Sequence, residues 1–220
     1  MTDIEIDSIK QKLHQHGFVV FDADNTDDCL LELSNKIGKV VPGDKGDLVQ
    51  TLMAQDKGGG SYGSFTYSVG YGAFPWHTDT AYWDSPVRYL MLTSEKPSTC
   101  ATLARTFDSL AANIEDFMYL AERSVFMLDI PGKRRMLTPV VKKTGLIGYR
   151  FDFHIYKPMN KEAIRLSDLM LEQLHNDSQR VIWTGHNVLL LDNWLVVHSR
   201  ECAINDRSRS LKRIYINELV

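Results

Sequence analysis

Apolar residues recur at helical spacing in four parts of the chain. In the first of them, Ile4, Ile9 and Leu13 fall on one side of a helix, and Gly17 follows where that helix would end. The side chains of residues 24–26 can cap the start of the second predicted helix. These patterns predict helices over residues 4–15, 26–37, 109–122 and 161–175.

Short runs rich in β-branched and aromatic residues predict strands in most of the remaining chain. They lie at residues 18–21, 48–54, 125–130, 136–141, 147–155, 180–183, 188–191 and 213–218, with successive strands also expected across residues 65–107. Strands in the centre with helices at the start and on the flanks suit a sandwich better than a βαβ alternation. The sequence therefore predicts a mainly β fold with flanking helices around a double-stranded β-helix core, a jelly-roll of the cupin-like type.

A run of glycines at positions 58–60 interrupts the pattern between two predicted strands. Adjacent glycines are unfavourable in a helix or a strand, so residues 57–64 are predicted to form a loop. The sequence leaves open whether this loop is a plain surface connection or a lid over an active site.

Composition narrows the class of protein. A length of 220 residues suits one domain spanning residues 1–220, and 44% hydrophobic with 24% charged residues is ordinary globular usage. A net charge of −3 argues against a nucleic-acid partner, and the apolar run Val188–Leu191 is far too short to span a membrane. Three widely spaced cysteines and no signal peptide favour the cytoplasm. We expect a small-molecule partner, and the oligomeric state stays open.

His77 and Asp79 are the first candidates for chemistry. Residues two apart on a strand point to the same face, so this imidazole and this carboxylate would converge on one point. His198, which follows the apolar run of residues 188–192, is the candidate for a third ligand. Two histidines and one carboxylate on one side of a metal leave positions open, as in oxygen-activating ferrous enzymes.

Two further polar residues suit a carboxylate ligand next to such a metal. Arg209 follows His198 by 11 residues, and its guanidinium can bind a carboxylate with two parallel hydrogen bonds. Thr102 could donate its hydroxyl to the same carboxylate. This is the arrangement that a bound 2-oxoglutarate needs, because its keto acid end chelates the metal and its far carboxylate needs a fixed cation.

The ordered set resembles the TauD/TfdA and clavaminate synthase-like family of Fe(II)- and 2-oxoglutarate-dependent dioxygenases. That family has His-x-Asp, a threonine some two dozen residues later, a distal histidine and then Arg-x-x-x-Arg. The matching residues here are His77, Asp79, Thr102, His198, Arg209 and Arg213. The resemblance covers roughly residues 65–218. Two departures are the short chain, which lacks or trims the family's long lid insertions, and Thr99-Cys100 where a glycine pair is usual.

The resemblance implies a role for each matched residue and a reaction. His77, Asp79 and His198 would hold Fe(II), and Arg209 with Thr102 would bind the co-substrate 2-oxoglutarate. Arg213 would face the substrate or support the site. Reaction with O2 would yield succinate and CO2 and hydroxylate an unactivated C–H bond of a small molecule. Desaturation, epoxidation and cyclisation stay open, whereas the intact Asp79 argues against halogenation, since related halogenases replace this carboxylate.

Candidate substrate contacts come from two segments. Aromatic residues crowd the His-x-Asp motif, among them Trp76 and Tyr82. Arg150, Asp152 and His154 alternate with apolar residues, so they are predicted to share one face of a strand. Clavaminate synthase-like members that act on amino acids have a similar Arg-Phe-Asp stretch in the substrate pocket. By that resemblance Asp152 could pair with the amine of an amino acid or natural-product intermediate; the alternative is a half-exposed strand face.

Two other classes of function compete with the dioxygenase. One is a non-catalytic jelly-roll protein that binds or regulates without turnover. The other is a different cupin-like metalloenzyme, such as a zinc hydrolase or an isomerase, whose site would normally contain more histidines than this set offers. The remaining histidines, namely His14, His16, His175 and His186, have no partner at ligand spacing and are expected on the surface or in the core.

Overall fold

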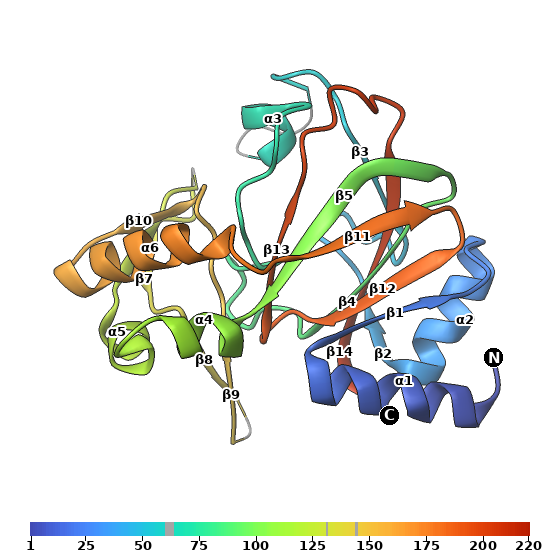
Figure 1. Cartoon of the computed structure of the whole chain (residues 1–220), viewed down its shortest axis with the longest axis horizontal. Coiled ribbons are helices and arrows are strands. Elements are labelled where there is room, and N and C mark those ends of the chain that lie inside the picture. The colour runs from blue at the N-terminus through green and yellow to red at the C-terminus, as the bar shows by residue number, and fades with distance from the viewer. Residues whose placement is uncertain (60–63, 131, 144) are drawn as a thin grey trace.

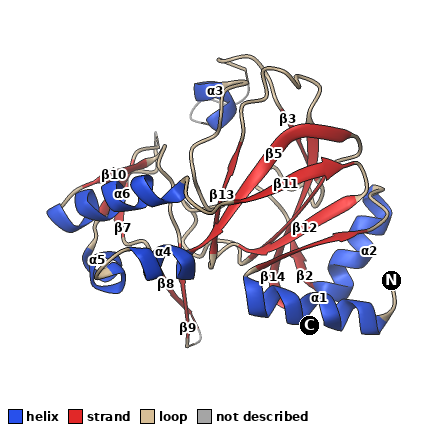
Figure 2. Ribbon diagram, viewed as in Figure 1, coloured by secondary structure: helices blue, strands red, loops and turns tan. Residues whose placement is uncertain are grey.

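The computed structural model describes residues 1–59, 64–130, 132–143 and 145–220, so part of the predicted glycine loop lies outside the described residues. Its centre is a pair of antiparallel sheets (Figures 1 and 2). The main sheet has the order β1 (Phe18–Asp22), β12 (Asn187–Asp192), β4 (Tyr89–Thr93), β14 (Ser210–Leu219) and β2 (Gly38–Val41), with β3 (Gln50–Met53) also paired to β14. The minor sheet consists of β11 (Gln179–Thr184), β5 (Pro97–Thr106) and β13 (Val196–Arg200).

An apolar core fills the space between the two sheets. Leu90 and Leu189 of the main sheet pack with Ala104, Trp183 and Val196 of the minor sheet, and all are buried. Every residue of β12 is buried because its other face is covered as well. This arrangement confirms the predicted jelly-roll class.

Helices α1 (Asp3–His16) and α2 (Asp27–Ile37) cover the outer face of the main sheet (Figure 1). Helix α1 starts at a capping box made by Thr2 and Glu5 and ends at Gly17, whose φ of 77° is left-handed. Its buried stripe contains Ile6 with Ile9 and Leu13, whereas Ile4 is 83% exposed. The helix was therefore predicted correctly, but Ile4 is not part of its apolar face.

A second layer of elements lies beside the minor sheet. It contains the helices α4 (Phe107–Asn113), α5 (Phe117–Arg123) and α6 (Lys161–Leu174), the strands β6 (Phe126–Leu128), β7 (Arg135–Leu137) and β10 (Tyr156–Pro158), and the hairpin β8 (Val140–Lys143) with β9 (Leu146–Tyr149). Its core includes Phe126, Phe151 and Leu166 and extends to Val197 on β13. The described helices include none with the length and apolar character to cross a membrane.

Three predicted elements are wrong in ways that bear on the site. Instead of successive strands from residue 65, the short helix α3 (Phe65–Val69) starts at Ser64, whose hydroxyl accepts from the Tyr67 backbone N–H. The helix predicted over 109–122 is divided by Asp116, which has a φ of 60°. The strand predicted over 147–155 ends at Tyr149, and the Asp152 carboxylate accepts backbone N–H groups in a turn that follows.

Candidate metal centre

His77 and His198 lie side by side because their backbones pair. Each donates its N–H to the carbonyl of the other at 2.9 Å, and their ring centroids are 4.4 Å apart. His198 belongs to β13, and His77 belongs to an extended segment that also pairs with Asp152. Residues from distant parts of the chain therefore meet at one edge of the minor sheet.

Asp79 completes the cluster. Its Oδ1 lies 3.5 Å from Nε2 of His77 and 3.6 Å from Nε2 of His198. Neighbouring ligands in an octahedron with bonds of about 2.1 Å are roughly 3 Å apart, so a small closure of these atoms would suit a metal ion. The exposed fractions of His77, Asp79 and His198 are 7%, 6% and 5%. Among the described residues, no other group of three or more histidine, cysteine and acidic side chains is close enough together to hold a metal ion.

The hydrogen bonds of the cluster leave the correct atoms free for a metal. His77 Nδ1 donates to the carbonyl of Pro75 at 2.8 Å, so Nε2 keeps its lone pair. Burial lowers the pKa of His198 and favours its neutral imidazole. Asp79 Oδ2 accepts from Arg213 Nη1 at 2.9 Å and from the Tyr215 hydroxyl at 3.2 Å. Oδ1 is therefore the oxygen that could bind a metal.

The charge of the Asp79 carboxylate is also controlled. Burial opposes its ionisation, but the Arg213 guanidinium and the two imidazoles outweigh burial and hold the pKa of Asp79 well below its usual value. Burial raises the pKa of Tyr215, so its hydroxyl stays protonated and donates. Burial lowers and contact with the Asp79 carboxylate raises the pKa of His77, with a net rise, so a bound metal would compete with a proton for this imidazole. Two imidazoles and one carboxylate oxygen form a donor set that fits ferrous iron.

The convergence of His77 and Asp79 does not come from a shared strand face, so that part of the prediction is wrong. After His77 the chain makes a turn at Thr80, whose φ is 54°. Asn193 holds this turn: its Oδ1 accepts the Asp79 N–H at 2.7 Å and its Nδ2 donates to the Asp79 carbonyl at 2.9 Å. Sequence reasoning missed both Asn193 and Tyr215. The signal for Asn193 was a polar residue directly after an apolar strand.

Thr102 and Arg209 contact each other beside the cluster. Arg209 Nη2 donates to Thr102 Oγ1 at 3.2 Å, and its Nε donates to the Cys100 carbonyl at 3.0 Å. Thr102 lies on β5 two residues before Ala104, which pairs with His198, so Thr102 and His198 are on the same face of the minor sheet. Arg209 is 6% exposed, and burial lowers the pKa of its guanidinium.

The candidate substrate residues are divided between two places. Asp152 is buried next to His77, and burial raises its pKa to about 6. His154 Nε2 lies 2.8 Å from the Ser68 hydroxyl of α3. Arg150 instead donates to the carbonyls of Trp83 and Thr138. The single strand that would have placed Arg150, Asp152 and His154 on one face is absent from this described segment because of the turn after Tyr149.

Trp76 and Tyr82 lie at different depths. Trp76 is 4% exposed and packs in the core beside a cavity of about 440 Å³ that is bordered by Phe153, His175 and Arg200. Tyr82 is half-buried and donates its hydroxyl to Asp44. Neither contact shows a substrate role.

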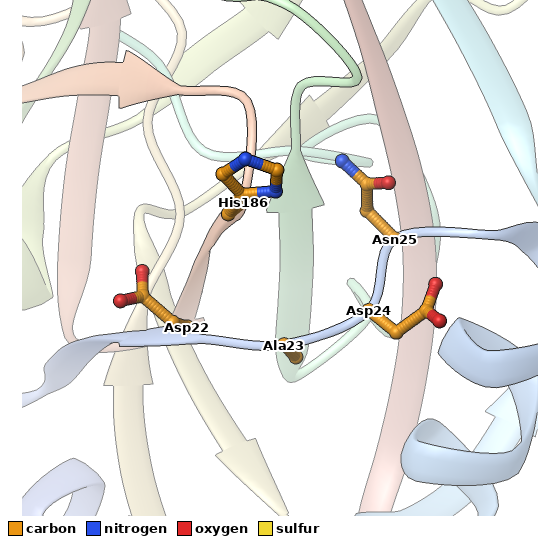
Figure 3. A pocket seen from close by; sticks show the side chains of 5 residues that line it. All are labelled: Asp22, Ala23, Asp24, Asn25 and His186. Atoms are coloured by element: carbon orange, nitrogen blue, oxygen red, sulfur yellow. The ribbon is translucent and has the colours of Figure 1, made fainter.

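A separate surface pocket lies at the end of β1, next to the β11–β12 turn (Figure 3). Asp22, Ala23, Asp24, Asn25 and His186 line it. The carboxylates of Asp22 and Asp24 point in opposite directions (Figure 3), and the Asn25 amide already donates to the Ser94 and Gly185 carbonyls. This pocket shares no lining residue with the His77 cluster.

Comparisons with known proteins agree with this geometry. The model of the "Taurine catabolism dioxygenase TauD, TfdA family" matches residues 1–111, which include His77, Asp79 and Thr102. A search of curated proteins finds no match.

Several solved structures share the fold. Asparagine oxygenase in complex with Fe(II), 3-hydroxyasparagine and succinate superposes with a TM-score of 0.78 at 12% identity, covering 98% of this chain and 78% of the other. The non-heme iron oxygenase OrfP, in complex with Fe and α-ketoglutaric acid, gives 0.73 at 18% identity, covering 99% and 81%. PvcB from Pseudomonas aeruginosa gives 0.70 at 18% identity, covering 96% and 79%.

Proposed function

The chain belongs to the taurine catabolism dioxygenase TauD, TfdA family, and we propose that this Fe(II)- and 2-oxoglutarate-dependent oxygenase hydroxylates an unactivated C–H bond of a small molecule. The reaction would consume O2 and release succinate and CO2. The observation that carries the proposal is the buried cluster of His77, Asp79 and His198, in which Oδ2 of Asp79 is engaged and Oδ1 is free. We further propose that residues 1–220 form one catalytic domain.

Each residue has a defined task in this proposal. His77, Asp79 and His198 hold Fe(II), which when bound supplies the activation of O2. Arg209 and Thr102 bind the 5-carboxylate of 2-oxoglutarate. Arg213 supports the site, because its guanidinium bridges Asp79 and the Gln50 side chain. Burial of the cluster excludes water from these charged groups and strengthens their interactions.

Anaerobic addition of Fe(II) and 2-oxoglutarate to the metal-free protein tests this function. We expect a visible metal-to-ligand charge-transfer band, because the keto acid end of 2-oxoglutarate chelates Fe(II) in the open positions. On admission of O2, succinate should form. If neither the band nor succinate appears, a non-catalytic binding protein or another cupin-like metalloenzyme is the better interpretation.

We propose that the substrate carries a cationic amine, as an amino acid or a natural-product intermediate derived from one would. The support is Asp152, a buried carboxylate beside His77 that accepts hydrogen bonds from the backbone N–H groups of His154 and Ile155. An amine next to it would offset the cost of burying its charge. The complexes of asparagine oxygenase with 3-hydroxyasparagine and of OrfP with (3S)-hydroxy-L-Arg contain amino acids of this kind.

Asp152→Asn tests the amine contact. L-amino acids and their derivatives are screened first for succinate release, and the most active one is used for the comparison. We expect its KM to rise about tenfold or more in the variant, since a charge-assisted contact is lost, while 2-oxoglutarate binding is unchanged. Asp129→Asn is the matched control, because Asp129 pairs with the solvent-facing Lys157. An unchanged KM for the substrate would remove Asp152 from the substrate site.

A further inference from the structure

Arg200 is a second buried arginine beside Arg209 whose charge the described contacts leave uncompensated. It is 5% exposed, and Arg209 is 6% exposed. Their hydrogen-bond acceptors are the carbonyls of Gly70, Gly72 and Cys100 and the Thr102 hydroxyl, none of which carries a negative charge. The Asp206 carboxylate acts on Arg209 through its charge, but its oxygens accept hydrogen bonds from Ser98 and Ser208. A buried cation without an anionic partner is costly, so this pair of guanidiniums favours an anion between or beside them.

Strand pairing fixes where Arg200 lies. In the ladder between β13 and β5, Arg200 is directly opposite Thr102, so their side chains are on the same face. The Thr102 hydroxyl is also the acceptor for Arg209 Nη2 at 3.2 Å. Arg200 therefore lies opposite Thr102 on the neighbouring strand, and Arg209 contacts Thr102 through its guanidinium.

Arg200 also has a structural contact, which does not use all of its donors. Its Nη2 donates to the Gly70 and Gly72 carbonyls, and its Cζ lies 3.7 Å from the centroid of the Phe74 ring. These contacts hold the segment that leads to His77. Nε of Arg200 is buried with no hydrogen-bond partner among the described residues.

We propose that Arg200 is a second cationic residue of the co-substrate site and that, with Arg209, it selects a 2-oxo acid carrying a second carboxylate. The inference rests on the proposed function, because it concerns the same site. The preference of the site for a dicarboxylate over a monocarboxylate would then depend on Arg200 as well as on Arg209.

Two ligands separate charge recognition from general damage. 2-Oxoglutarate and 2-oxopentanoate share the keto acid end, and only the first has a carboxylate at C5. Their dissociation constants are measured by calorimetry on protein loaded with Mn(II), which avoids turnover. In Arg200→Met we expect 2-oxoglutarate to bind about tenfold more weakly and 2-oxopentanoate to bind within about twofold of wild type. Arg200→Lys, which keeps the charge, should retain most of the preference for 2-oxoglutarate.

Arg105→Met is the matched control. Arg105 is also a buried arginine on the minor sheet, 2% exposed, and donates to the carbonyls of Gln173 and Asn176, but it lies on the face opposite Thr102. We expect the variant to lose stability while keeping the wild-type ratio of the two affinities.

Two results would overturn the inference. A wild-type ratio of the two affinities in Arg200→Met, with both ligands unaffected or equally weakened, would assign Arg200 to holding residues 70–74 only. If Arg200→Met does not fold, an Arg200→Lys variant that has lost the preference would also contradict the proposal. A wild-type protein that binds no 2-oxoglutarate would instead defeat the proposed function, and this inference with it.

Discussion

Replacing any one of His77, Asp79 and His198 with alanine is expected to lower turnover of 2-oxoglutarate by more than about a thousandfold, because each variant removes one of the three donors that hold the metal. The three side chains are buried within one cluster, so no neighbouring side chain of the described site is placed to substitute. Iron content after reconstitution and succinate formation are the measurements. We expect both to fall together.

The three variants differ in what else they disturb. Asp79→Ala also leaves Arg213 and Tyr215 without their shared acceptor, so this variant should lose stability as well as metal. His77→Ala and His198→Ala leave that contact intact, and a loss of iron binding with little change in melting temperature would identify the ligand role. His186→Ala is the matched control, since His186 lines the separate surface pocket. Wild-type turnover in all three cluster variants would show that the ligand assignment is wrong.

The candidate ligands could be found in the sequence because metal chemistry restricts the residue type, and the resemblance to a known family supplies the order. Few side chains bind ferrous iron, so His77, Asp79 and His198 in the order of a known family form a recognisable pattern. Arg209 and Thr102 could be found in the same way, because a carboxylate ligand needs a guanidinium and a hydroxyl and the family has both at these places. The structure brings these two residues into contact, and it places Arg213 on the unused oxygen of Asp79.

The residues that orient the cluster could not be found in the same way. Asn193 acts on the backbone of Asp79 across a sequence separation of 114 residues, and any polar residue after a strand could have been a surface turn. Tyr215 lies between Ile214 and Ile216 on β14, and nothing in this apolar run distinguishes it from an aromatic residue of the core. Their roles depend on where the turn at Thr80 meets the end of β12, which is a property of the packed sheets and not of local sequence.

The strand predicted over residues 147–155 was wrong because a side chain, and not a neighbouring strand, accepts the backbone N–H groups there. The alternation of polar and apolar residues after Tyr149 resembles a strand, but the Asp152 carboxylate accepts the N–H groups of His154 and Ile155 and turns the chain. That turn separates Arg150 from the metal cluster and leaves Asp152 next to His77. Of the three residues, Asp152 is therefore the one proposed to contact the amine, and His154 lies beside it next to Ser68 of α3.

Arg209→Lys is expected to raise the concentration of 2-oxoglutarate required for half-maximal turnover by about a hundredfold. Arg209 is held through two of its nitrogens, with Nε on the Cys100 carbonyl and Nη2 on Thr102 Oγ1, and its planar group can still present N–H donors to a carboxylate. A lysine ammonium at the same place has one nitrogen and cannot hold these acceptors and a carboxylate in a fixed plane. The KM for 2-oxoglutarate and its dissociation constant on Mn(II)-loaded protein measure the effect.

Arg207→Lys is the control for a change of guanidinium to ammonium in the same segment. Arg207 is exposed and stacks on the Tyr71 ring at 5.0 Å, so we expect its replacement to leave 2-oxoglutarate binding unchanged. An unchanged requirement in Arg209→Lys would remove Arg209 from the co-substrate site. The metal cluster would still stand in that case, because its donors do not depend on Arg209. If 2-oxoglutarate binding weakens in Arg209→Lys but not in Arg207→Lys, and the iron content is preserved, the far carboxylate of 2-oxoglutarate binds on the Thr102 side of the minor sheet.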